Sequence, residues 1–177
     1  WARVATGFVG GKGPNAIFSL GRTFTWIGGD GGYVYFSADV TSGVTAQSAG
    51  SATVQNLNAI HGSDEDNLVA VGDANAVLVT SNGGATWAAV VGPNVAVNLT
   101  SVFMHSKFTW FVGDASGNLW YTIDGGVTWN AKAFSGSGAG IVSDIKFATN
   151  TVGYMAHATA TPAGRVFRTV DGGATWY

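Results

Sequence analysis

The sequence has no cysteine, and only 10% of its 177 residues are charged. Without cysteine the chain has no disulfides and no thiolate metal sites, which fits either a cytosolic or an extracellular protein. Eight Lys and Arg against ten Asp and Glu give a formal net charge of −2. We expect no nucleic-acid partner, because binding a phosphate backbone requires a basic surface. No apolar run approaches the ~18 residues that span a bilayer, so we expect no membrane insertion.

Glycine and aromatic residues, in contrast, are abundant. The chain contains 27 Gly, ten Phe and seven Trp, and 46% of its residues are hydrophobic. This composition is typical of a turn-rich protein with a sizeable core. Short runs of Val, Ile, Phe, Tyr and Trp bounded by Gly, Asp and Asn indicate strands, and no segment has sustained helical spacing. We therefore predict an all-β fold.

One phrase recurs along the chain. It reads TSNGGATW at residues 80–87, TIDGGVTW at 122–129 and TVDGGATW at 169–176. Its third position aligns Asp39, Asn82, Asp124 and Asp171, and an apolar residue lies upstream in register at Ile17, Ile60, Val102 and Ile145. We predict four repeats, approximately over residues 15–46, 57–87, 99–129 and 142–176, each with four short strands. Four-stranded repeats of ~40 to 50 residues are typical of β-propeller blades, so we predict a β-propeller of antiparallel blades.

The phrase resembles the Asp box, or BNR repeat, of a family of β-propellers. Its pattern, Ser/Thr-x-Asp-x-Gly-x-Thr-Trp, is matched by Thr122, Asp124, Gly126, Thr128 and Trp129, and by Thr169, Asp171, Gly173, Thr175 and Trp176. Thr80, Asn82, Gly84, Thr86 and Trp87 match it with Asn in place of Asp. The first copy, around Asp39, has two extra residues and Ala46 in the Trp position. The fuller repeat is more similar to that of photosystem II assembly factors than to that of sialidases.

The resemblance implies that each box is a structural hairpin between the third and fourth strands, on the face away from any ligand. The residue types agree, since an Asp or Asn oxygen caps a turn, Gly supplies a positive φ and Trp buries a large apolar area. A catalytic acid is the other interpretation of the box carboxylates. Asn82 can cap a turn but cannot act as an acid or base, so we predict structural boxes and no catalytic residue.

A second set of polar residues recurs at the end of the second strand of each repeat. It comprises Asp30, Asp73, Asp114 and, in the fourth repeat, His157. In a ring of blades these four residues share one face and are the candidates for binding a cation or a sugar. The alternative, which we favour, is that each Gly-Asp pair begins a turn that the Asp caps. No His spacing indicates zinc. The acidic loop at residues 64–66 could hold calcium, but we favour a solvated turn there, so we expect no metal and no cofactor.

Sialidases of this fold use three arginines from separate blades and a Tyr–Glu pair. This chain has four Arg, of which Arg165 and Arg168 lie on one predicted strand, and a single Glu, Glu65. We therefore expect a non-enzymatic structural or protein-interaction module, with a protein partner or self-association, in an extracellular or virion setting. The thylakoid lumen or periplasm is the alternative location. A carbohydrate-binding module is the second function, weakened because Tyr33 alone is an aromatic residue placed near the expected glycan face; a glycoside hydrolase is the third.

The ends of the chain raise the question of how a ring would close. Trp1 precedes Ile17 by the same spacing as Trp129 precedes Ile145, so Trp1 takes the position of a box Trp from a preceding repeat. The sequence is then a processed product, an internal piece or a chain with an unseen start. We expect residues 1–14 to supply an outer strand of a closing or neighbouring blade. An open edge would invite strand pairing, so we favour a piece of a larger or oligomeric assembly.

Overall fold

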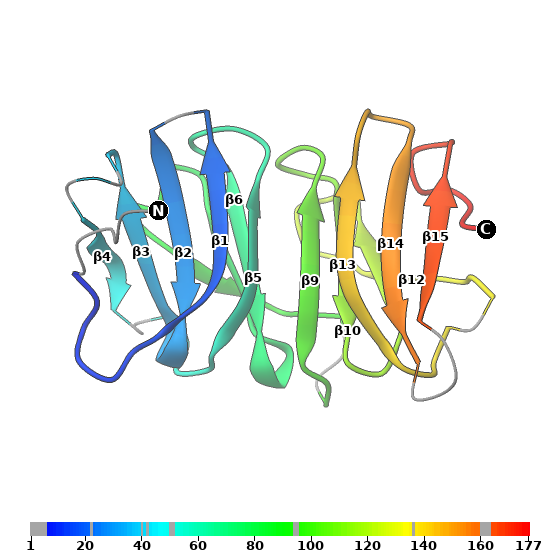
Figure 1. Ribbon diagram of the computed structural model, residues 1–177, viewed down its shortest axis with the longest axis horizontal. Coiled ribbons are helices and arrows are strands. Elements are labelled where there is room, and N and C mark those ends of the chain that lie inside the picture. Colours follow the sequence, from blue (N-terminus) through cyan, green and yellow to red (C-terminus); the bar gives the residue numbers. More distant parts are fainter. Residues whose placement is uncertain are drawn as a thin grey trace.

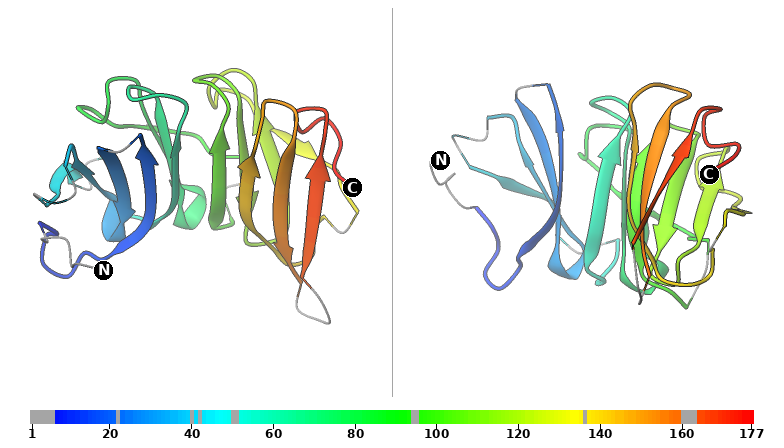
Figure 2. Two further views of the ribbon diagram at one scale, coloured as in Figure 1. Left: turned by 45° about the horizontal axis from the view of Figure 1, so that its top comes forward. Right: turned by 45° about the vertical axis from the view of Figure 1, so that its right-hand side comes forward.

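The computed structural model describes residues 7–21, 23–39, 41, 43–49, 52–93, 96–135, 137–159 and 164–177. These residues form four antiparallel sheets, each built from consecutive strands, arranged in chain order around an open arc (Figures 1 and 2). The prediction of an all-β chain with four antiparallel sheets is confirmed. No helix among the described residues is long and apolar enough to cross a membrane.

The strands within each sheet follow one another from the inside of the arc outward. The first sheet comprises β1 (Pro14–Leu20), β2 (Phe24–Gly29), β3 (Tyr33–Ser37) and β4 (Thr45–Ala49). The second comprises β5 (Leu57–Gly62), β6 (Leu68–Gly72), β7 (Val77–Thr80) and β8 (Ala88–Val90). The third comprises β9 (Leu99–Met104), β10 (Trp110–Asp114), β11 (Leu119–Thr122) and β12 (Asn130–Lys132), and the fourth β13 (Ile141–Phe147), β14 (Gly153–Ala158) and β15 (Arg165–Thr169). One-turn 3-10 segments, η1 (Asp30–Gly32) and η2 (Asp73–Asn75), follow β2 and β6.

The ends of the chain differ from a complete four-stranded sheet. The fourth sheet has three strands, but Tyr177 exchanges two backbone hydrogen bonds with Arg168, at 2.9 and 3.1 Å, as the start of a fourth strand would. The outer strand predicted over residues 1–14 falls partly on residues 1–6, which lie outside the described residues. Residues 7–13 form no strand.

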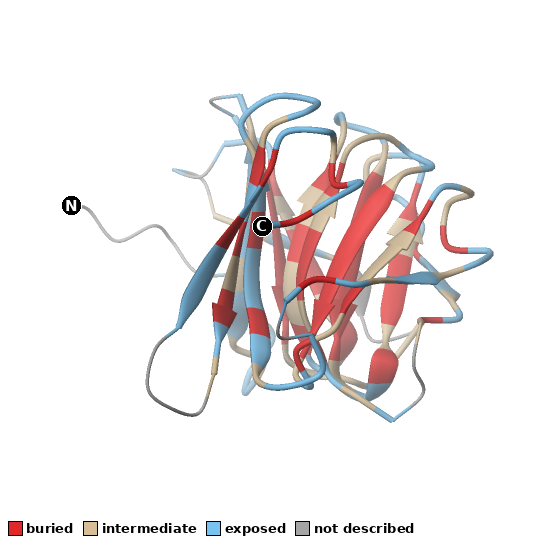
Figure 3. Cartoon of the chain, turned by 90° about the vertical axis from the view of Figure 1, so that its right-hand side faces the viewer, coloured by how far each residue is buried: buried red, intermediate tan, exposed pale blue. Residues whose placement is uncertain are grey.

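The core lies in three layers between adjacent sheets, because alternate side chains of a strand point to opposite faces and each sheet is apolar on both. We call these layers the first, second and third interfaces, in chain order. Their centres are Trp26, Leu57 and Leu78 in the first, Val69, Val102 and Val112 in the second, and Phe111, Ile145 and Phe167 in the third. The middle sheets are covered on both faces, and every residue of β6 and of β10 is buried. Figure 3 shows this burial beside the fourth sheet, whose strands alternate between buried and exposed residues.

The box tryptophans link successive sheets. Trp87 belongs to the first interface, Trp129 packs against the second and Trp176 belongs to the third. Each box Trp therefore contacts the sheet that precedes its own. In the first sheet the sequence predicted Ala46 at this position, but the pairing of Phe36 with Thr45 places Val44 there, because the extra residues of the first box shift the alignment. The first sheet consequently offers no indole to a preceding neighbour.

Candidate functional site

The boxes of the third and fourth sheets are closed by the same four hydrogen bonds. In the third, the Thr122 hydroxyl donates to Asp124 Oδ1 at 2.7 Å and accepts the Gly126 N–H at 3.0 Å. The Thr128 N–H donates to Asp124 Oδ1 at 2.9 Å and its hydroxyl to Oδ2 at 2.6 Å. The fourth sheet repeats this arrangement around Asp171, with Thr169, Gly173 and Thr175. Gly126 has φ +85°, and a Cβ there would lie 2.9 Å from the Trp110 ring, so the position requires glycine.

The box of the second sheet preserves this geometry with an amide. Asn82 Oδ1 accepts the Thr80 hydroxyl at 2.8 Å and the Thr86 N–H at 3.0 Å, while Asn82 Nδ2 donates to the Thr86 hydroxyl at 2.9 Å. The direction of one hydrogen bond is reversed and the turn is kept. In the first sheet Asp39 accepts hydrogen bonds from two residues ahead, from the N–H and hydroxyl of Thr41, which is a different turn.

The hydrogen bonds of the two Asp boxes also fix their charge. The hydroxyl and N–H of Thr128, with the hydroxyl of Thr122, lower the pKa of the Asp124 carboxyl to about 2. Thr175 and Thr169 lower the pKa of Asp171 to about 2 in the same way. Both groups are ionised at neutral pH, so neither holds a proton to donate in catalysis.

Asp30 and Asp73 lie at the opposite end of the sheets from the boxes, where each holds amide groups of its own sheet. Asp30 accepts from the Gly13 N–H at 3.0 Å and from Asn15 Nδ2 at 2.9 Å, and the Asn15 contact is the main reason that the pKa of Asp30 is lowered. Asp73 accepts from Asn58 Nδ2 at 2.9 Å and Asn56 Nδ2 at 3.2 Å. These carboxylates connect the start of the inner strand to the end of the second.

Asp114 and His157, at the same end, are buried. Asp114 accepts the N–H groups of Ser116 and Asn118 and, at 2.8 Å, the Trp120 indole N–H. Neither ring nitrogen of His157 has a hydrogen-bond partner among the described residues, and burial, followed by the charge of Arg165, lowers the pKa of its imidazole. The binding of a cation or sugar by these four residues stays a prediction. Among the described residues, no three His, Asp or Glu side chains are placed to hold a metal ion.

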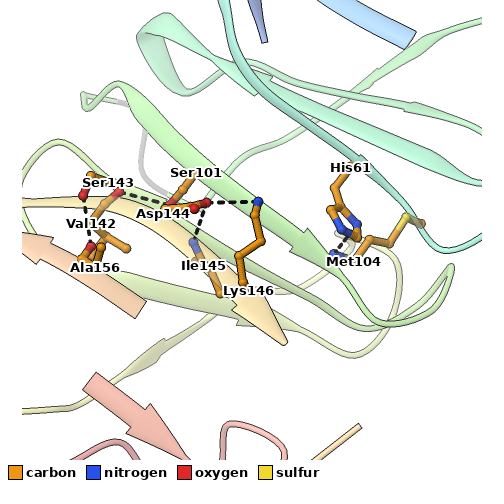
Figure 4. A network of polar contacts seen from close by, with 9 residues as sticks. All are labelled: His61, Ser101, Met104, Val142, Ser143, Asp144, Ile145, Lys146 and Ala156. Atoms are coloured by element: carbon orange, nitrogen blue, oxygen red, sulfur yellow. Dashed lines mark hydrogen bonds and ion pairs between the residues drawn. The ribbon is translucent and has the colours of Figure 1, made fainter. Parts of the chain in front are cut away.

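Rings cross the inner strands from sheet to sheet. Phe18 lies 4.7 Å from His61, His61 lies 4.4 Å from Phe103 and Phe103 lies 5.0 Å from Phe147, measured between ring centroids. The Met104 N–H donates to His61 Nδ1 at 3.3 Å, which joins the second and third sheets (Figure 4). Burial, and then the nearby charge of Lys146, lowers the pKa of His61 to about 4. Lys146 is itself paired with Asp144 at 3.1 Å.

A pocket of about 400 Å³ opens beside the boxes, at the end of the second interface. The second sheet contributes Val79 and Trp87 to its walls, and the third sheet contributes Met104, Trp110 and the turn residues Lys107 and Phe108. The Phe108 side chain is 53% exposed at the rim, and Lys107 Nζ lies 4.9 Å from the centre of its ring. Lys107 forms no ion pair within the described part of the chain. The pocket thus combines apolar and aromatic walls with polar box residues, the negative Asp124 and the positive Lys107.

The first interface shows why the pocket forms where it does. There the corresponding space holds only about 160 Å³ and is lined by Phe24, Trp26 and Phe36. Strand registers place Asn67, Val69 and Val79 of the second sheet at these three positions. Because these side chains are smaller than Phe24, Trp26 and Phe36, they do not fill the space at this end of the second interface, and a pocket remains. The turn at the rim also changes, from Glu65 and Asp66 to Lys107 and Phe108.

The pocket lies on the box side, where the sequence predicted no ligand. Box residues form part of its wall, among them Thr86, Trp87 and Asp124, but the strand and turn residues that complete it, such as Val79 and Met104, carry no motif. A comparison of equivalent repeat positions would have identified the Phe36-to-Val79 change, but only once the pairing register was known.

No protein-family model matches this sequence, and no curated protein is significantly similar to it. Solved structures do align. A structure of YCF48 bound to D1 peptide matches with a TM-score of 0.56 at 22% identity, over 70% of this chain and 40% of that one. The GH74 enzyme of Niastella koreensis matches with a TM-score of 0.74 at 18% identity, over 92% of this chain and 29% of that one. These neighbours are β-propellers. The chain has a β-propeller fold.

The similarity extends to a computationally designed protein, Ika4, with a TM-score of 0.62 at 17% identity over 94% of this chain and 98% of that one. Identities this low establish the propeller fold and no activity, because one fold supports many functions. The match covers less than half of the length of the peptide-bound YCF48 chain and of the Niastella koreensis GH74 chain.

Proposed function

We propose that this chain is a non-enzymatic propeller module of the Asp-box type, which binds a protein partner through the pocket beside the second and third boxes. The pocket carries the proposal: aromatic and other apolar side chains form much of its wall, it is large enough for one bulky side chain, and an exposed aromatic residue stands at its rim. The structure of YCF48 with a peptide supports a peptide partner for a propeller of similar repeats. An extracellular or virion setting stays a prediction.

The chemistry of the pocket specifies the occupant. Trp87, Trp110 and Met104 favour a large apolar side chain, because aromatic residues and Met are enriched in the buried centres of interfaces. Lys107 favours a carboxylate close to that side chain. We therefore expect an exposed or extended protein segment with a Phe, Leu or Met next to an acidic residue.

The absence of enzymatic activity is part of the proposal. The acid that lines the pocket is Asp124, which the box holds ionised. Asp114 is buried and bonded within its own turn. A pair of carboxylates free to share acid and base functions does not occur among the described residues of the pocket.

Selection from a displayed library of random short peptides tests the proposal, with intrinsic tryptophan fluorescence to measure affinity. Enriched peptides should carry the apolar and acidic pair and bind the wild-type chain. Val79→Phe, which introduces the residue type of the first sheet, should fill the pocket and weaken binding about tenfold or more, equal to ~1.4 kcal/mol. Val127→Asp is the control, because Val127 is 81% exposed on the third box and lines no described pocket.

Three results would contradict the proposal. One is a library that yields no binder, and another is a set of binders that tolerate Val79→Phe as well as Val127→Asp. The third is binding on a glycan array that Val79→Phe leaves unchanged, which would favour the carbohydrate-binding alternative at another surface.

A further inference from the structure

The first and fourth sheets each have one face without a neighbouring sheet in the described part of the chain. We call the face of the first sheet that is turned away from the second the leading face. The face of the fourth sheet that is turned away from the third is the trailing face. These two sheets stand at the two ends of the arc (Figures 1 and 2). Strand registers give every position on them an equivalent in the three packed interfaces.

The leading face keeps the residues of a sheet interface. Ile17 is 67% exposed, whereas its equivalents Ile60, Val102 and Ile145 are buried in the first, second and third interfaces. Part of the face is covered by the segment before β1, where the Phe8 ring packs edge-on against Tyr35 at 4.8 Å. Beside this contact remains an apolar pocket of about 320 Å³, lined by Phe8, Pro14, Ile17 and Ile27 among others.

The trailing face also exposes apolar residues whose equivalents are buried in the packed interfaces. Val166 is 72% exposed, although its equivalents Val34, Val77 and Leu119 are completely or almost completely buried. Tyr154 is 44% exposed, although its equivalents Trp26, Val69 and Phe111 are buried. Exposed apolar residues at positions that pack elsewhere in a repeat indicate an uncovered interface.

The two faces are complementary by position. In the second interface, Val69 and Val77 of one sheet pack in the same cluster as Val102 and Val112 of the next. The trailing face supplies Tyr154 and Val166 at the first pair of positions. The leading face supplies Ile17 and Ile27 at the second pair, around the 320 Å³ pocket.

The two faces also depart from the repeat at matching places. Arg168 takes the position of Phe36, Val79 and Tyr121, each of which packs in a cluster with the next sheet's box Trp. On the leading face the strand register puts Val44 at that box position. A long side chain on one face thus corresponds to a missing indole on the other.

We propose that a second copy of this chain covers both faces, so that the trailing face of each copy packs on the leading face of the other. A two-fold axis along the inner strands relates the copies. The pairing uses the leading and the trailing face of both copies once, and the contact closes into a ring of eight sheets in which every sheet has a neighbour on each side. The occupant is a second copy because one molecule carries both halves of the interface and the repeat defines how they meet.

The test is the mass in solution of the 177-residue chain, by light scattering after size exclusion. The wild-type chain should have twice the 18.1 kDa mass of one copy, and Ile17→Asp and Val166→Lys should each shift it to 18.1 kDa. Val127→Asp, on the third box, should remain a dimer. Both substituted side chains are largely exposed, so circular dichroism should show that the variants stay folded.

Mixing the two monomeric variants tests which faces meet. A dimer of one copy of each variant has one wild-type interface. In its other interface the introduced carboxylate faces the introduced ammonium group. Mixing Ile17→Asp with Val166→Lys should therefore restore the dimer mass. A wild-type chain that stays at 18.1 kDa at high concentration would overturn the proposal, as a further set of sheets in a longer chain would then be needed to cover the faces. Dimers that survive both substitutions, a mixture that stays monomeric, or masses that rise beyond a dimer would overturn it as well.

Discussion

The carboxylate of each Asp box organises two threonines, and the second box shows which part of that role needs a charge. Asn82 keeps the two bonds to Oδ1 and reverses the third. We therefore expect Asp124→Asn to change the melting temperature little. Asp124→Ala removes the acceptor of the Thr128 N–H and should lower the melting temperature by roughly 2–6 °C. Thermal unfolding by circular dichroism measures both, and equal losses for the two variants would contradict the structural role of the box.

Ala74 in η2 adopts a conformation that favours glycine. Its φ is +50°, whereas Gly31 fills the equivalent position of η1 with φ +66°. Left-handed backbone is costly for residues with a Cβ, so Ala74→Gly should raise the free energy of unfolding by ~0.5–1 kcal/mol. Ala76→Gly is the matched control, because Ala76 has φ −64°, and this change should lower the free energy of unfolding by a similar amount. Urea denaturation measures the sign of the change in the free energy of unfolding for each variant. Destabilisation by both changes would contradict the expectation.

At the scale of elements, the inner strands couple the sheets through His61. The pKa of its imidazole is lowered to about 4, mainly by burial and then by Lys146 and His105, with Asp144 opposing. The unfolded chain takes up this proton near pH 6.5, so stability should fall as the pH decreases from 6.5 to 4, by up to ~3 kcal/mol. His61→Phe introduces the residue type of Phe18 and Phe103 at the equivalent positions.

The His61→Phe variant should therefore be less sensitive to acid than the wild type. It loses the acceptor of the Met104 N–H, at a cost of ~1 kcal/mol near pH 7.5, and regains stability relative to the wild type as the pH falls to 5. Some pH dependence should remain, because the pKa values of His105 and His157 are also lowered. Urea unfolding at a series of pH values measures the difference, and parallel curves for the two proteins would refute it.

The elements were predictable from the sequence, and the pocket between them was not. Strands and box turns depend on residues close in the chain, so the period-two pattern and the repeated phrase predict them. The pocket depends on Val79 facing Trp110 across an interface, and on Phe36 being larger than Val79 at the equivalent position. Such a difference in volume has no local signal. The buried position of Asp114 beside Trp120 likewise depends on a side chain that the Gly-Asp pattern does not include.

At the scale of the whole molecule, the main contacts between sheets in the described part of the chain join sheets that follow one another, so stability should vary along the arc. The middle sheets are packed on both faces, and every residue of β6 and β10 is buried. In β14, alternate residues point to the uncovered trailing face. Opening of an outer sheet exposes one interface, whereas opening of a middle sheet exposes two.

Hydrogen–deuterium exchange followed by mass spectrometry should show this gradient. In the monomeric Val166→Lys variant we expect peptides from β6 and β10 to exchange at least about tenfold more slowly than peptides from β14 and β15, a difference of ~1.4 kcal/mol in opening free energy. The wild-type chain provides the comparison. If a second copy covers the trailing face, protection of β14 and β15 should rise toward that of the middle sheets, while β6 and β10 change little. Uniform exchange across all four sheets in the monomer would instead mean that the arc unfolds as one cooperative unit, which contradicts nearest-neighbour stabilisation.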